Sequence, residues 1–158
     1  MFSSLFLSKN QRIVRKWKKE HEKIILLAHK VVAEYSKNHR KKAKKNLILL
    51  NNLAIDHIIS EDLKFYKFLN GEQRILPDRK VAIENFIDTF RDIKPELMSF
   101  LTKYTRKDAI LDDEFFQRFN ELVEVLIERI QYEEKNLYAL LDISREKEKW
   151  EEIKHNMS

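Results

Sequence analysis

Apolar side chains recur at three- and four-residue steps along four long stretches of the chain, the spacing of an amphipathic α-helix. The stretches cover residues 10–36, 39–70, 78–104 and 113–142. A kink or break is expected near Ile93 and Lys94, because Pro95 has no amide donor for a helix interior. Short connections make consecutive helices antiparallel. We therefore predict an all-α fold, an antiparallel up-down-up-down four-helix bundle.

The two ends of the chain do not continue this pattern. We assign residues 1–10 to a lead-in, residues 11–142 to the bundle and residues 143–158 to a charged tail. The tail can form a fifth helix anchored by Trp150 and Ile153. Terminal segments with several aromatic residues are usually tied down. The apolar side chains of the lead-in are therefore expected to pack on the bundle: Phe2, Leu5, Phe6 and Leu7.

Polar residues interrupt the apolar stripe of the second stretch at two positions. The stripe consists of Leu50, Leu53, Ala54, His57, Glu61, Phe65 and Phe68. His57 and Glu61 lie one helical turn apart, with Cβ atoms roughly 5–6 Å from each other. A histidine and a carboxylate buried together need partners. An H-x-x-x-E pair that faces a bundle interior can also present two ligands to one metal ion.

Two other stretches carry polar residues on their apolar faces. His21 lies on the seam of the first stretch, which continues through Ile24 and Ala28. Arg129 and Glu133 interrupt the seam of the fourth stretch four residues apart. Tyr132 and Glu134, the residues on either side of Glu133, are expected to lie outside this seam.

Composition narrows the choice of class. One glycine and two prolines in 158 residues favour long helices in a single domain. The absence of cysteine excludes disulfides, a cysteine nucleophile and thiolate metal ligands. The formal net charge is +5, but both signs are dense, which indicates solvated helix faces and no specific nucleic-acid binding. The basic run from His39 to Lys45 is accordingly expected to be a solvated helix start.

The sequence shows no apolar run as long as the ~18–20 residues of a membrane span. Its first residues do not have the charge pattern of a signal peptide. We therefore expect a cytoplasmic protein.

The polar seam positions resemble those of the hemerythrin-like (HHE cation-binding) family. The similarity covers about residues 13–142 and rests on L-x-x-D-H-x-x-x-E-D around His57 and I-x-x-E-E-x-x-L-Y around Glu133. That family is an antiparallel four-helix bundle with a non-haem di-iron site. The resemblance implies that His21 and His57 are terminal ligands of one iron. It also implies that Glu61 and Glu133 match the two carboxylates that bridge the irons in that family.

The chain departs from the family pattern at the second iron. Arg129 stands where the family has a histidine of the last helix, and the third stretch has apolar residues where ligands would be. We expect Arg129 to occupy the place of the lost ion, with one iron held by the other four residues. The alternative is a metal-free polar core in which histidine and arginine hydrogen-bond the two glutamates.

Two functions follow from this degenerate pattern. The first is a regulatory or sensory protein-interaction module, whose partner is another protein. The position of Trp17 near the start of the first stretch and the chain length also resemble those of the bacterial anti-sigma regulators of sigma D, which are helical bundles. The alternative is an iron-binding protein for oxygen, nitric oxide or iron sensing or handling. No catalytic nucleophile stands out, so we do not expect an enzyme.

Overall fold

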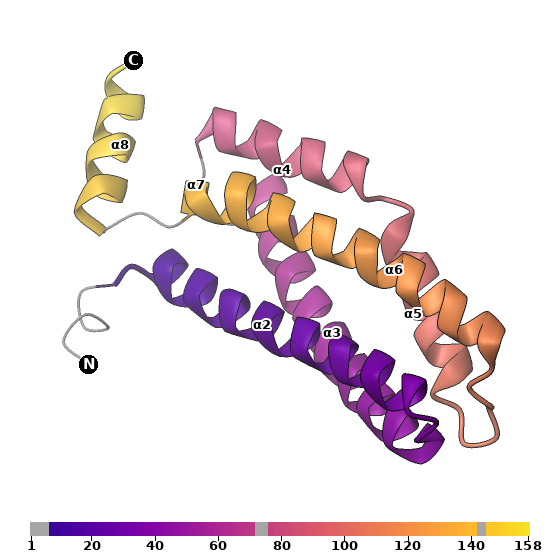
Figure 1. The fold of residues 1–158 in the computed structure, drawn as a ribbon. Helices are drawn as coiled ribbons and strands as arrows, with labels where there is room; N and C mark the ends of the chain where they lie inside the picture. Colours follow the sequence, from indigo (N-terminus) through magenta and orange to yellow (C-terminus); the bar gives the residue numbers. More distant parts are fainter. Residues whose placement is uncertain (1–6, 72–75, 142–144) are drawn as a thin grey trace.

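The computed structural model describes residues 7–71, 76–141 and 145–158, and the regular structure in these ranges is helical throughout (Figure 1). The helices are α2 Lys9–Ser36, α3 Arg40–Leu69, α4 Pro77–Thr89, α5 Ile93–Tyr104, α6 Asp113–Tyr132, the π-helix η1 Glu133–Tyr138, α7 Ala139–Leu141 and α8 Arg145–Met157. The all-α prediction is thereby confirmed. Among these helices, none combines the length and the apolar character that crossing a membrane requires.

Local signals explain where the long helices begin. Ser8 caps α2 through a reciprocal pair of hydrogen bonds with Gln11. Asp112 accepts a hydrogen bond from the amide of Phe115 and caps α6. Between α2 and α3 the chain reverses through Asn38, whose φ of 62° is in the left-handed region that asparagine tolerates. In the lead-in, the contacts expected for Phe2, Leu5 and Phe6 lie outside the described residues, and Leu7 is half-buried.

The third predicted helix is two helices. α4 ends at Thr89 and α5 begins at Ile93, so the break lies a few residues before the expected one. Pro95 lies in the first turn of α5, where its missing amide has no intrahelical partner to lose. A continuous helix would require that amide, which explains why the chain breaks upstream of the proline.

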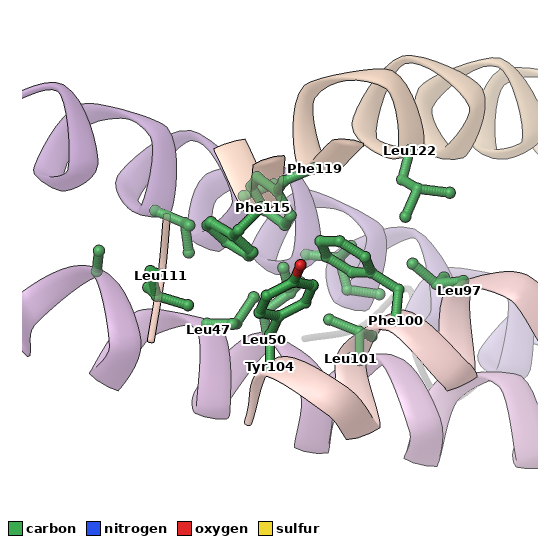
Figure 2. Packing of buried hydrophobic residues seen from close by; sticks show 14 of the residues in the cluster. Leu47, Leu50, Leu97, Phe100, Leu101, Tyr104, Leu111, Phe115, Phe119 and Leu122 are labelled. Carbon is green, nitrogen blue, oxygen red and sulfur yellow. The ribbon is translucent and has the colours of Figure 1, made fainter. Parts of the chain in front are cut away.

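Two apolar clusters form the interior. The larger one is built from the second half of α2, the first half of α3, α5 and α6 (Figure 2). Its centre is a stack of rings, in which the ring centroid of Phe115 lies 5.5 Å from that of Phe100 and 5.3 Å from that of Phe119. The smaller cluster joins the other ends of α2 and α3 to α4 and η1, and consists of Val14, Trp17, Phe65, Phe68, Ile83, Phe86, Leu137, Tyr138 and Leu141.

The polar seam residues lie between these clusters. Along α2, His21 separates Trp17 of the smaller cluster from Ile24 of the larger one. Along α3, Glu61 separates Ile58 from Phe65 in the same way. The polar layer is therefore closed off by apolar packing above and below.

Two surface predictions have different outcomes. The basic run is exposed at Arg40, Lys41 and Lys42, as expected. Lys44, however, donates to the carbonyl of the last residue of α5 and to two carbonyls of the segment that joins α5 to α6. The expected anchors of the tail are wrong, because Trp150 is 63% and Ile153 47% exposed on α8. α8 is dominated by charged residues and has too few apolar side chains to form a buried face.

Candidate metal centre

Four side chains from three helices meet in the polar layer. They are His21 from α2, His57 and Glu61 from α3, and Glu133 from the start of η1. One ligand atom from each lies within 4.8 Å of those from the other three, and all four residues are buried. Imidazole nitrogen and carboxylate oxygen suit iron and zinc among other ions. The predicted convergence of these residues is confirmed, and the cluster can hold a metal ion.

His57 is oriented by a carboxylate that the sequence pattern did not reveal. Its Nδ1 lies 2.6 Å from Oε2 of Glu20, a half-buried residue of α2. With Nδ1–H donating to Glu20, Nε2 faces Oε1 of Glu61 at 2.6 Å. That contact is close but lacks the alignment of a hydrogen bond, since Nε2 has no hydrogen-bond partner. A carboxylate behind a histidine is the usual way to fix a metal-binding imidazole.

His21 lies against both glutamates. Its Nε2 is 3.3 Å from Oε2 of Glu133 and 3.6 Å from Oε1 of Glu61. Burial lowers the pKa of His21, but the hydrogen bonds and charges of Glu133 and Glu61 outweigh it and raise the pKa to about 9. Without metal the imidazole therefore holds a proton at neutral pH.

The two glutamates have opposite pKa shifts. Burial opposes ionisation of Glu61, yet the adjacent imidazoles of His21 and His57 hold its pKa well below the usual value. Burial and the negative charge of Glu61 raise the pKa of Glu133 to about 7. One carboxylate is thus firmly ionised while its neighbour titrates near neutrality, the behaviour of two like charges that share a site.

Arg129 is the fixed positive charge beside this pair. Its Nε donates to Oε1 of Glu133 at 2.7 Å, and a terminal nitrogen lies 3.8 Å from Oε2 of Glu61. The guanidinium also lies 5.1 Å from the centre of the Phe86 ring. The prediction that Arg129 faces both carboxylates is confirmed.

Tyr138 completes the cluster, and seam analysis missed it. The residue is fully buried, and its hydroxyl contacts Glu61 Oε1, Glu133 Oε2 at 2.9 Å and His21 Nε2 at 3.2 Å. In an α-helix, residues five apart point in different directions, about 140° from each other. The π-helix η1 adds the extra residue that brings Glu133 and Tyr138 to the same side. The last letter of the I-x-x-E-E-x-x-L-Y match was the one available signal.

The two residues next to Glu133 agree only in part with the prediction that both lie outside the seam. Glu133 points inward and the side chain of Glu134 is 35% exposed, in agreement with the prediction. Tyr132 does not fall off the seam, because its ring packs 5.9 Å from Phe86 and 5.4 Å from Phe90. Tyr132 is the last residue of α6 and packs against the smaller apolar cluster.

The cluster contains polar atoms that the protein itself leaves unpaired. Among the described residues, His21 Nδ1, His57 Nε2 and Glu61 Oε2 are buried without a hydrogen-bond partner. Buried polar atoms of this kind are costly unless a proton, an ion or water satisfies them. Two carboxylates against one guanidinium also leave a negative charge, which the proton on His21 balances without metal and which a bound cation can balance in its place. The residues therefore fit one metal ion.

A groove of about 500 Å³ runs beside the cluster between α3, α4 and α6. Its walls are largely apolar and include Leu63, Tyr66, Phe86 and Phe90. Arg129 contributes to the lining, so one side chain links the groove to the polar layer.

Comparisons with protein-family models, with curated proteins and with solved structures find no match for this chain.

Proposed function

We propose that this protein binds a single iron ion through His21, His57, Glu61 and Glu133, inside a hemerythrin-like antiparallel four-helix bundle. In this arrangement α4 and α5 together take the place of the third helix. The observation that supports the proposal is the meeting of four buried nitrogen and oxygen ligands within 4.8 Å. Glu20 behind His57 supports it further, since it fixes the imidazole that a metal would need.

Arg129 takes the place of a second ion in this proposal. Its guanidinium donates to Oε1 of Glu133 and faces Oε2 of Glu61. The histidines lie against the other oxygen of each carboxylate. A planar cation there supplies one positive charge that can neither be lost by chelation nor change its oxidation state. One ion per chain follows, where the family pattern has two.

A single iron in this position suits sensing or handling of oxygen, nitric oxide or iron itself. Binding oxygen or nitric oxide requires a coordination position on the iron that the protein does not fill. The groove that reaches Arg129 brings small apolar molecules close to the polar layer.

The test is metal content after an excess of ferrous iron, or zinc, is added and unbound metal is removed by desalting. We expect one ion per chain for the wild type and none for His57→Ala. His29→Ala is the matched control, since His29 is an exposed histidine of α2 and the variant should keep its ion. Two ions per wild-type chain, or equal retention by both variants, would refute the one-ion proposal.

A second candidate function is the regulatory protein-interaction module, and the surface of α3 favours it. Ile59, Leu63 and Tyr66 are between 51% and 62% exposed, and the last two border the groove. Apolar side chains that gather at the rim of a groove are typical of protein contact sites. The partner would insert apolar side chains between α3 and α4.

Cross-linking and mass spectrometry of the tagged protein in its native cells test this candidate. Tyr66→Glu should abolish the cross-links while iron content stays unchanged. Ile110→Glu serves as the control, because Ile110 is 80% exposed and is not among the residues that line the groove. Cross-links that survive Tyr66→Glu would place the partner elsewhere.

A further inference from the structure

The hydroxyl of Tyr138 lies between two carboxylate oxygens that compete for its single proton. A phenol carries one O–H, yet this oxygen contacts two carboxylates and one imidazole nitrogen. If its proton goes to Glu61, the 2.9 Å contact with Glu133 needs a second proton to be favourable. A cation at this point would satisfy all these lone pairs at once.

Packing holds the hydroxyl in this position. The Tyr138 ring stacks on His21 with centroids 5.3 Å apart and packs at the same distance on Trp17. The residue is fully buried, so its oxygen cannot turn to solvent without opening the smaller cluster. A donor fixed in this way is preorganised, as ligands of protein metal sites are.

Charge counting connects this oxygen to the oxidation state of the ion. With neutral histidines and a protonated Tyr138, two carboxylates and one guanidinium leave one negative charge. A divalent ion turns this into one positive charge. A trivalent ion gives the same single positive charge if Tyr138 binds as phenolate, because that adds one negative charge.

Resting on the metal site proposed above, we propose that Tyr138 is a fifth protein ligand, which binds as phenolate when the ion is ferric iron. When ferric ion binds, the O–H bond of Tyr138 breaks, an iron–oxygen bond forms and the proton leaves to solvent. No electron is transferred in this step. A hard, anionic oxygen suits a trivalent ion better than a divalent one, and a bound cation reverses the preference of a buried phenol for its neutral form.

The test is the visible spectrum of protein loaded with one equivalent of ferric nitrilotriacetate and then desalted. We expect one iron per chain and a phenolate-to-iron charge-transfer band, which zinc-loaded protein lacks. Tyr138→Phe keeps the ring that packs on Trp17 and should lose the band. Tyr104→Phe, a buried tyrosine of the larger cluster, is the matched control and should keep it.

A second variant covers the case in which Tyr138→Phe does not fold. Replacing Tyr35, Tyr66, Tyr104 and Tyr132 by phenylalanine leaves Tyr138 as the single tyrosine of the chain. Resonance Raman excitation in the band should then still enhance tyrosinate ring modes. Iron bound without a band, a band in Tyr138→Phe, or loss of the ring modes would overturn the role of Tyr138 and leave the metal site standing. Retention of neither iron nor zinc would refute the metal site and this inference together.

Discussion

At the scale of single residues, Arg129 determines whether the polar layer is stable without metal. Removing one partner of a buried charge cluster commonly costs ~3–5 kcal/mol, because the other charges remain. Arg129→His should therefore lose about that much free energy of unfolding at neutral pH without metal. Imidazole is also a metal ligand, so added ferrous or zinc ion should recover part of the loss by mass action. Urea unfolding with and without metal measures both effects.

Glu134→Ala is the control for this prediction. Glu134 neighbours the inward carboxylate Glu133, but its side chain is 35% exposed. Its replacement should change the free energy of unfolding by less than ~0.5 kcal/mol, as surface changes usually do. Equal losses in Glu134→Ala and Arg129→His would mean that Arg129 is not a buried counter-charge.

The buried His21 makes stability depend on pH. The folded pKa of His21 is about 9, against an ordinary pKa of 6.5, so the stability from its proton is complete below pH 6.5 and lost by pH 9. The raised pKa of Glu133, about 7, acts in the same direction between pH 4.5 and 7. Without metal, the free energy of unfolding should fall by on the order of 1–3 kcal/mol from pH 6.5 to 9.

Metal should reverse this trend, because protons and metal compete for His21. Urea unfolding of the zinc-loaded protein over the same pH range provides the comparison. A metal-free protein whose stability rises toward pH 9 would show that His21 is not protonated between the glutamates.

Residue positions were predictable where helical periodicity applied. His21, His57, Glu61, Arg129 and Glu133 stand on apolar seams, and a seam position in an amphipathic helix points to the interior. Tyr138 and Glu20 follow no such rule. The position of Tyr138 depends on a change of helical pitch at η1, and Glu20 reaches inward from the edge of the seam of α2.

At the scale of elements, the π-helix is the feature that positions Tyr138. A π-helix corresponds to one residue inserted into an α-helix. Deleting Lys135, an exposed residue of η1, should therefore restore an α-helix with Glu133 and Tyr138 on one face. We expect the free energy of unfolding to change by no more than about 1 kcal/mol, the size of an ordinary substitution. Thermal unfolding followed by circular dichroism measures this.

The matched deletion is Glu124, an exposed residue inside α6. Its loss rotates everything that follows by about 100° and moves Arg129 and Glu133 off the seam. This variant should lose its cooperative transition and its metal. If both deletions are equally harmful, η1 does not act as a one-residue insertion.

The elements themselves were predictable to different degrees. The long helices agree with the seam pattern within about two residues, which is the usual uncertainty of helix ends. The division of α4 from α5 was expected from Pro95, but its position depends on where the chain leaves the helix before the proline. No single-sequence pattern marks a π-helix.

At the scale of the whole molecule, the polar layer divides the interior into two apolar clusters. α2 and α3 run through both clusters, whereas α5 contributes to the larger one and α4 to the smaller one. An ion held by α2, α3 and η1 would therefore join the parts at the level where apolar contacts are interrupted. Such an ion would have a structural role in addition to the proposed one in sensing.

The most direct test of the central claim is a crystal structure of the iron-loaded protein with anomalous diffraction collected at the iron edge. We expect one anomalous peak per chain, bounded by His21, His57, Glu61 and Glu133, with Arg129 on the far side of the carboxylates. A second peak next to Arg129 would contradict the one-ion site. No peak in the cluster, with the four side chains hydrogen-bonded as a closed polar core, would contradict metal binding itself.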